Sequence, residues 1–273
     1  MTSSVLLDTR SVAADLVRNG VALQDFPVDD LVVPVVEGWL QFLKKPFEEK
    51  LRWKFLNPNN ADDIGGELEG PDDGYICRNR ERRHDGTQYD RKEFFHYKRC
   101  LPKLLDAVGV DTSAETEWLK DLKRLHDACI QMSLVVTGQL EQYFPGHNLL
   151  ARAERGVELG LPTLRLLCYK QAEEEGEQIG KLHTDRDWLT HHLADSMPGL
   201  MYKTNGKVVE YKKIPNKVLL FPGKKAAKLL GRALPAVPHE VRACPESVGQ
   251  RRWTVVFFGH NDVHLTPEER ISL

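Results

Sequence analysis

Three residues in the second half of the chain have the side chains and spacing to hold one metal ion. His183 and Asp185 lie two residues apart, and His239 follows after several short β-rich segments. On a β-strand, residues two apart point to the same face, so the first two side chains could reach one ion. An H-x-D pair alone is weak evidence, because a surface pair arises easily by chance in a chain with ten histidines.

The distal histidine strengthens the case for a metal site. A strand-rich path can cross a jelly roll and return His239 to the end where His183 and Asp185 lie. Two imidazoles and one carboxylate occupy one face of an octahedron and leave three positions open, which suits iron(II) oxygen chemistry. Zinc favours a closed tetrahedral set, and magnesium or calcium prefers more oxygen ligands. The sequence therefore predicts an iron(II) centre of His183, Asp185 and His239.

A second group of residues could bind a carboxylate. Arg252 and Thr254 begin the last predicted strand and would share a face. Arginine grips a carboxylate with two parallel hydrogen bonds, and a nearby hydroxyl can add a third. The alternative is an arginine paired with a structural Asp or Glu, because a buried guanidinium needs an anionic partner. Tyr169, in the segment LRLLCYK, could donate a hydrogen bond to the same ligand if its strand face points inward.

The pattern of elements predicts an α+β chain with a mainly β core. Apolar residues at helical spacing indicate helices over residues 28–43 and from about 112 to 143, the second with Thr112 and Glu115 as a capping box. Residues 57–74 read as a long loop. Short strands, expected in a sandwich or barrel, are indicated at 75–78 and 93–98 and then at LRLLCY, LMYKT, KVVEY, KVLLF and WTVVFF.

Composition narrows the classes of function. The 273 residues carry a formal net charge of −2 and no basic stripe, which argues against nucleic-acid binding. No apolar run approaches the roughly 20 residues that cross a bilayer, and no secretory signal is recognisable. Five scattered cysteines without a C-x-x-C pair suggest a reducing compartment. We expect a cytoplasmic protein, a monomer or weak homodimer, with a small molecule as partner.

Several segments together resemble the isopenicillin N synthase-like branch of the iron(II)/2-oxoglutarate-dependent dioxygenases. The resemblance covers most of the chain. NGVALQDF, PFEEKLRW, GYICR and YDRKEFFHY are similar to the N-terminal region of that branch, and LRLLCYK, HTD, PGLMY, FPG, PHEV and RWTVVFF follow the order of its catalytic core.

The resemblance implies a double-stranded β-helix, also called a jelly roll or cupin-like fold, with N-terminal helices and a long bracing helix. Residues 1–110 would form a mixed N-terminal region and residues 111–273 the catalytic core, as one functional domain. Iron(II) would be held by His183, Asp185 and His239, and 2-oxoglutarate by Arg252, Thr254 and Tyr169. The reaction with O2 would release succinate and CO2 and hydroxylate, desaturate or cyclise a substrate, for example in secondary metabolism.

Some features leave the substrate open. Arg165 shares the strand face of Tyr169 and could anchor a substrate carboxylate, as in an amino-acid-like substrate, or form a structural ion pair. Tyr75, Arg78 and Arg80 are further candidates, if their segment folds over the mouth. His191 and His192 are expected at the surface. The chain ends soon after its last strand, so residues 57–74 are the candidate lid. An oxidase that does not use 2-oxoglutarate and an inactive jelly-roll binding protein are the alternatives.

Overall fold

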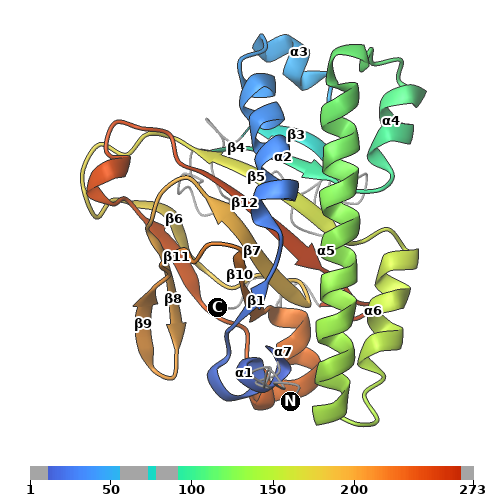
Figure 1. The fold of residues 1–273 in the computed structure, drawn as a ribbon, viewed down its shortest axis with the longest axis vertical. Coiled ribbons are helices and arrows are strands. Elements are labelled where there is room, and N and C mark those ends of the chain that lie inside the picture. The colour runs from blue at the N-terminus through green and yellow to red at the C-terminus, as the bar shows by residue number, and fades with distance from the viewer. Residues whose placement is uncertain (1–11, 56–72, 78–91, 266–273) are drawn as a thin grey trace, which may run out of the picture.

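The computed structural model describes residues 12–55, 73–77 and 92–265. Two antiparallel sheets of this part of the chain lie face to face, and helices cover the outer surface of the larger sheet (Figure 1). A cluster of buried apolar side chains fills the space between the sheets and includes Leu167 and Phe221 from one and Leu200 and Val241 from the other. A second, larger cluster lies between the larger sheet and the helices. The protein is therefore layered as helix, sheet and sheet.

The larger sheet has eight strands in the order β1-β10-β7-β12-β5-β4-β3-β2. Its strands are β1 (Ala22–Asp25), β2 (Lys54–Phe55), β3 (Asp73–Cys77), β4 (Lys92–Tyr97), β5 (Thr163–Tyr169), β7 (Leu189–Asp195), β10 (Lys217–Pro222) and β12 (Trp253–Gly259). The smaller sheet has the order β6-β11-β8-β9, with β6 (Gln178–His183), β11 (His239–Arg242), β8 (Leu200–Thr204) and β9 (Lys207–Glu210). From β5 onward the chain alternates between the two sheets, except at the β8–β9 hairpin within the smaller sheet. This is the winding of a double-stranded β-helix and confirms the predicted fold class.

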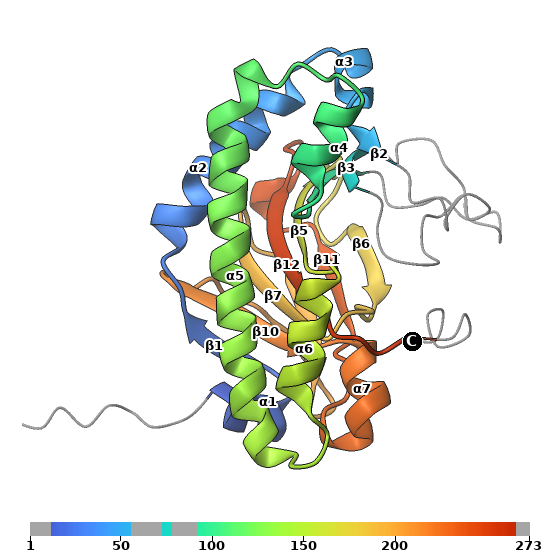
Figure 2. The same cartoon turned by 90° about the vertical axis from the view of Figure 1, so that its right-hand side faces the viewer.

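Seven α-helices are present in the described residues. They are α1 (Val12–Asn19), α2 (Val28–Leu43), α3 (Phe47–Leu51), α4 (Leu101–Ala107), α5 (Thr116–Tyr143), α6 (Leu149–Glu158) and α7 (Lys224–Leu230). The 28-residue α5 runs along one side of the molecule beside α2 and α6 (Figure 2). Its buried stripe includes Leu122, Leu125, Cys129, Val136 and Leu140, spaced mostly three or four residues apart. This helix is the predicted brace for the larger sheet.

The start of α5 differs from the prediction. Residues Ser113–Glu115 form a short 3-10 turn, η2, and the α-helix begins at Thr116. The predicted capping box is therefore wrong. Glu115 is buried, and its carboxylate forms an ion pair with Lys45 instead of reaching back to the backbone of Thr112. By contrast, α2 has the predicted bounds, and Trp118 of α5 donates a hydrogen bond to the Val35 carbonyl oxygen within it, at 2.9 Å.

The predicted loop at residues 57–74 overlaps a strand at its end. Asp73 and Gly74 belong to β3, and residues 57–72, the rest of the proposed lid, lie outside the described residues. Gly74 has φ +75°, and a Cβ there would meet the Trp53 carbonyl oxygen at 1.7 Å, so the pairing of β2 with β3 requires glycine. The larger sheet joins β2, β3 and β4 to later strands, and the division at residue 110 stays a prediction.

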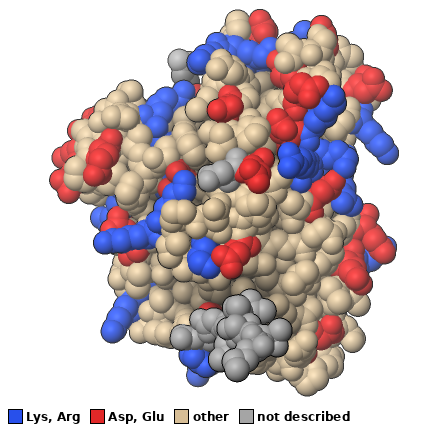
Figure 3. Space-filling view, viewed as in Figure 1, with Lys and Arg blue, Asp and Glu red and all other residues tan. Residues whose placement is uncertain are grey.

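Two features bear on possible partners. No helix among the described residues is long and apolar enough to cross a membrane. On the face in Figure 3, acidic and basic side chains are interspersed rather than gathered by sign. This face has no single-sign surface of the kind that binds a nucleic-acid backbone.

Candidate active site

The smaller sheet brings the two predicted histidine ligands together. His183 is the last residue of β6 and pairs directly with His239, the first residue of β11. Asp185 follows two residues after β6. Its Oδ1 lies 3.5 Å from Nε2 of His183, and its Oδ2 lies 3.6 Å from Nε2 of His239. One ligand atom from each residue lies within 4.8 Å of the others, which is compact enough for a single ion.

Backbone contacts orient both imidazoles for metal binding. Nδ1 of His183 lies 2.7 Å from the Lys181 carbonyl oxygen, and Nδ1 of His239 lies 3.1 Å from that of Val237. A carbonyl oxygen only accepts, so each Nδ1 carries the proton and each Nε2 keeps its lone pair for a metal. Thr190 donates a hydrogen bond to Oδ2 of Asp185 at 2.6 Å and orients the carboxylate. The donor set therefore fits iron(II) in the predicted three-residue arrangement.

Burial and neighbouring groups set the protonation of these ligands. Burial lowers the pKa of His239 to about 4, against the opposing effect of Asp185. Burial by itself raises the pKa of the Asp185 carboxyl, but His239, His183 and the Thr190 hydroxyl together hold that pKa well below its usual value. At neutral pH the site thus offers a neutral imidazole and an ionised carboxylate, the forms that bind metals.

The reason that His183 and Asp185 meet differs from the prediction. They do not share a strand face, because β6 ends at His183 and Asp185 lies in the loop that follows. The Asp185 carbonyl oxygen accepts a hydrogen bond from the Lys224 amide at 2.8 Å. A Cβ at Gly223 would lie 2.9 Å from that oxygen and 2.2 Å from the Asp187 carbonyl oxygen. The glycine of the FPG segment therefore lets the ligand-bearing loop pack against the start of α7.

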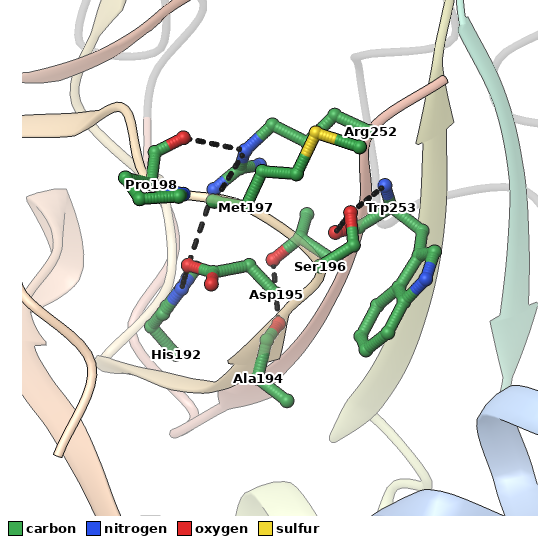
Figure 4. Close-up of polar contacts among 9 residues, drawn as sticks. His192, Ala194, Asp195, Ser196, Met197, Pro198, Arg252 and Trp253 are labelled. Atoms are coloured by element: carbon green, nitrogen blue, oxygen red, sulfur yellow. Dashed lines mark hydrogen bonds and ion pairs between the residues drawn. The ribbon is translucent and has the colours of Figure 1, made fainter. Parts of the chain in front are cut away.

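The predicted carboxylate-binding arginine is deeply buried. Arg252 is 1% exposed and immediately precedes β12. Its Nη2 donates to Oδ2 of Asp195 at 3.1 Å, and its Nε donates to the carbonyl oxygens of Met197 and Pro198 (Figure 4). Nη1 has no hydrogen-bond partner among the residues that the structure describes. Arg252 thus has the structural Asp partner that was the alternative prediction, and it also has one donor atom left for a ligand.

Tyr169 and Thr254 lie near Arg252. The Arg252 guanidinium carbon lies 5.9 Å from the centroid of the Tyr169 ring. Tyr169 reaches from β5 across to the smaller sheet, where a Cβ at Gly180 would lie 3.4 Å from its hydroxyl. Thr254 donates its hydroxyl proton to the Ala194 carbonyl oxygen at 2.9 Å, so it must rotate before it can donate to a ligand. The predicted roles of all three in binding 2-oxoglutarate stay proposals.

Arg165 lies on the same inner face of the larger sheet. Its guanidinium carbon is 4.6 Å from the centroid of Phe258 and 5.4 Å from that of Phe94, and its Nε donates to Nε2 of His96 at 2.7 Å. Phe258 pairs across the sheet with Thr190, which binds the ligand Asp185. Phe258 and Thr190 therefore link Arg165 to the candidate metal centre.

The other substrate candidates are placed differently. Tyr75 is fully buried and packs against Phe42, on the helix side of the sheet. Its hydroxyl donates to Glu93 at 2.6 Å, and Glu93 also binds Lys50 at 2.8 Å. This position corrects the expectation that Tyr75 faces the mouth, because its side chain belongs to a buried ionic cluster. Arg78 and Arg80 lie outside the described residues.

Both histidines that were expected at the surface are buried in β7. His191 is 0% exposed and points toward the helices, with its ring 5.5 Å from that of Phe257. His192 is 4% exposed, and its Nε2 lies 2.8 Å from Oδ2 of Asp195. Asp195 has no feature in the sequence that marks it as a functional residue. All seven residues of β7 are buried, although four of them are polar. The segment LTHHLAD therefore lacks the apolar pattern that would predict a buried strand.

A family model agrees with this site. Residues 162–261 match the model described as the 2OG-Fe(II) oxygenase superfamily, and this range contains all three metal-ligand candidates, Tyr169, Arg252 and Thr254. No curated protein sequence matches the chain.

Solved structures share the fold at low sequence identity. A protein described as a 2OG-Fe(II) oxygenase family member from Caulobacter crescentus has 24% identity and a TM-score of 0.68, over 96% of this chain and 85% of that one. A full-length Neurospora crassa protein in complex with alpha-KG has 20% identity and a TM-score of 0.68, over 96% and 84%. Dioxygenase for auxin oxidation 1 from Arabidopsis thaliana, with 2-oxoglutarate, has 17% identity and a TM-score of 0.67, over 96% and 91%.

These matches do not specify a branch, so the isopenicillin N synthase-like branch stays a prediction. The match to the family model, the jelly-roll fold and the His-Asp-His cluster agree with one another. Residues 162–261, which hold all three metal-ligand candidates, therefore match the 2OG-Fe(II) oxygenase superfamily, a family of enzymes that use iron(II) and 2-oxoglutarate.

Proposed function

We propose that this protein is an oxygenase that hydroxylates a small molecule and converts 2-oxoglutarate and O2 to succinate and CO2. The observation that carries the proposal is the convergence of His183, Asp185 and His239, with Nδ1 of each histidine held by a backbone carbonyl oxygen. Bound iron(II) and 2-oxoglutarate would supply the activation of O2. Desaturation and ring closure, which use the same site, are the variant outcomes.

Residues of the jelly-roll interior support 2-oxoglutarate as the co-substrate. Arg252 has a buried Nη1 without a hydrogen-bond partner among the described residues, and this atom could donate to the distal carboxylate. The ring of Tyr169 lies beside the same guanidinium. Thr254 could add a hydrogen bond after its hydroxyl rotates away from Ala194. The keto-acid end of the co-substrate would bind the metal that His183, Asp185 and His239 hold, and the other three residues would bind its distal end.

The surroundings of the metal ligands would also control access. The side chain of His183 is 49% exposed, whereas those of Asp185 and His239 are 9% exposed each. The centre is therefore open on the side of His183 and closed behind the other two ligands. Phe221, with its ring 4.9 Å from that of His239, covers this closed side and excludes water there. A substrate would enter on the His183 side.

Succinate formation from 2-oxoglutarate tests the proposal. Purified protein supplied with iron(II), 2-oxoglutarate and O2 should release succinate, and His239→Ala should lower the rate at least about a hundredfold through loss of the metal. His147→Ala, at an exposed histidine outside the site, is the matched control and should retain the wild-type rate. Wild-type activity in the His239→Ala variant would refute the proposed centre.

The oxidase alternative differs in one measurable respect. An iron(II) oxidase that holds its substrate with Arg252 and Thr254 would consume O2 without any requirement for 2-oxoglutarate. The bound 2-oxoglutarate or alpha-KG in two of the structural neighbours favours the dependent enzyme. Consumption of O2 that depends on a substrate but not on 2-oxoglutarate would select the oxidase. Iron binding without O2 consumption under either condition would select an inactive binding protein.

We further propose that the substrate carries a carboxylate or similar anionic group that binds Arg165. The guanidinium lies between the rings of Phe94 and Phe258 on the inner face of the larger sheet. Aromatic faces stabilise a cation and keep its plane oriented, so the edge of the group can hold an anion. The path through Phe258 and Thr190 to Asp185 supports a position of Arg165 next to the reacting part of the substrate.

A paired screen tests the role of Arg165. Small carboxylic acids that stimulate succinate formation in the wild type should lose that stimulation in Arg165→Gln, with an increase in KM of about tenfold or more. The corresponding neutral amides should stimulate both proteins equally. An Arg165→Gln variant that keeps the wild-type preference for acids over amides would exclude this anchor.

A further inference from the structure

A buried ionic cluster lies beside the proposed 2-oxoglutarate pocket. Asp195 joins two partners through one oxygen: Oδ2 accepts from Nη2 of Arg252 at 3.1 Å and lies 2.8 Å from Nε2 of His192 (Figure 4). Arg252, Asp195 and His192 are 1%, 7% and 4% exposed. Because the carboxylate can only accept, Nε2 of His192 carries the proton in this contact.

A β-bulge makes this cluster possible. Residues three apart on a regular strand point to opposite faces, so His192 and Asp195 of β7 should be separated by the sheet. The pairing of β7 with β12 shifts between Val255, which faces Ala194, and Val256, which faces His192. The extra residue, Leu193, therefore turns Asp195 back to the inner face. Bulges of this kind re-aim a side chain, and they occur often beside active sites.

The contacts of Arg252 leave one of its three nitrogens for a ligand. Asp195 engages Nη2, and the carbonyl oxygens of Met197 and Pro198 engage Nε. Nη1 is buried and without a hydrogen-bond partner among the described residues. Leaving a buried charged N–H group without an acceptor costs stability. A bound anion that accepts a hydrogen bond from Nη1 would satisfy this donor.

The ion pair with Asp195 is stable in its charged form. Burial by itself raises the pKa of the Asp195 carboxyl, but the hydrogen bond from His192 and the charge of Arg252 bring that pKa below its usual value. Asp195 therefore keeps its negative charge at neutral pH and holds the guanidinium on its Nη2 side. The opposite edge of the guanidinium is fixed as a consequence.

We propose that Asp195, oriented by His192, is a positioning residue that fixes Arg252 so that Nη1 holds the distal carboxylate of 2-oxoglutarate. This inference rests on the proposed function. Stability alone does not account for the arrangement, because a buried ion pair stabilises a fold no better than apolar residues of similar volume. Arg252 would bind the ligand through Nη1 alone, because Asp195 holds Nη2. This differs from an arginine that offers both of its terminal nitrogens to the ligand.

The test compares two keto acids that differ at the distal end. Iron(II)-loaded protein is titrated without oxygen, and binding is followed by the visible absorption band of the chelated keto acid. The ligands are 2-oxoglutarate and 2-oxobutyrate, which lacks the distal carboxylate. Asp195→Asn should raise the Kd for 2-oxoglutarate about tenfold through the weakened hold on Arg252. The Kd for 2-oxobutyrate should stay the same.

Two controls separate positioning from a general loss of structure. Asp262→Asn removes the partner of Arg152, an arginine–aspartate pair at 2.8 Å elsewhere in the protein, and should change neither Kd. In an Arg252→Gln background, Asp195→Asn should have no further effect on 2-oxoglutarate binding, because it acts through the guanidinium. If Asp195→Asn does not fold, His192→Gln takes its place and should shift the 2-oxoglutarate Kd in the same direction.

Each other outcome is decisive. An Asp195→Asn variant that binds 2-oxoglutarate as tightly as the wild type, or more tightly, overturns the inference. Equal weakening of both keto acids overturns it as well, because the effect would then not pass through the distal carboxylate. Wild-type protein that holds iron(II) and binds neither keto acid would overturn the proposed function itself.

Discussion

At the scale of single residues, the site depends on which nitrogen of each histidine is left for the metal. The backbone carbonyl oxygens of Lys181 and Val237 hold Nδ1 of His183 and His239, so both ligands present Nε2. The sequence allowed the three ligands to be predicted, because their residue types and order carry the signal. It did not reveal Asp195 or its partner His192, since their meeting depends on a bulge that no residue type in the segment indicates.

His191 gives a residue-scale prediction about stability and pH. Its ring is fully buried, neither ring nitrogen has a hydrogen-bond partner among the described residues, and burial lowers its pKa to about 3. An unfolded histidine takes up a proton near pH 6.5. As the pH falls from 6.5 toward 3, only the unfolded state gains that proton, and the folded state loses relative stability.

Replacement of His191 by leucine should remove this acid sensitivity. The free energy of unfolding of His191→Leu minus that of the wild type should be about 2 kcal/mol larger at pH 5 than at pH 8. The value follows from about 1.5 pH units over which only the unfolded wild type takes up a proton at this histidine. Urea denaturation at the two pH values measures the difference. His147→Leu, at an exposed position, should show no comparable change. An equal gain at pH 8 and pH 5 would mean that His191 does not titrate as described.

At the scale of elements, the helices and strands position the site through a few close contacts. The packing of α2 against α5 fixes the layer behind the larger sheet. At Gly38 of α2, a Cβ would lie 2.1 Å from Cδ1 of Trp118. Trp118 has little freedom to move, because its Nε1 donates to the Val35 carbonyl oxygen and its ring packs against Phe42 and Phe95.

Two glycine-to-alanine substitutions test this contact against helix propensity. Gly38→Ala should lower the free energy of unfolding by about 1–3 kcal/mol, because the added methyl overfills the contact with Trp118. Gly138→Ala in α5 has its nearest neighbour, Cδ2 of Leu150, at 3.9 Å and should raise that free energy by up to about 1 kcal/mol. Urea denaturation of both variants measures the pair. Similar changes in the free energy of unfolding of the two variants would contradict this packing of α2 against α5.

Elements with a clear residue pattern could be predicted from the sequence, whereas several short helices could not. The helix at residues 28–43 and the strand at 200–204 have the predicted bounds, since the apolar periodicity of one and the β-rich composition and turn signals of the other are clear. The short helices α3 and α4 span five and seven residues, too few to show a period. The end of β6 before Asp185 also depends on contacts with Gly223 and Lys224, which are distant in sequence.

At the scale of the whole molecule, the jelly roll has polar residues at two places beside the apolar cluster between its sheets. The metal-ligand candidates lie at one end of the smaller sheet, and Arg252 lies at the start of β12 in the larger sheet. A co-substrate with a keto-acid end and a distal carboxylate could span these two places. The family order of motifs allowed both ends to be predicted. The substrate could not be predicted, because single arginine and tyrosine side chains do not specify one, and the candidate Tyr75 lies in the core.

Titration of the iron(II) protein with 2-oxoglutarate in the absence of oxygen tests whether His183, Asp185 and His239 hold the metal at which the co-substrate binds. We expect a visible metal-to-ligand charge-transfer band that grows with added 2-oxoglutarate and saturates when one equivalent is bound. His239→Ala should give no such band, and His147→Ala should match the wild type. Wild-type protein that binds iron(II) yet develops no band at any 2-oxoglutarate concentration would contradict the assignment of the site.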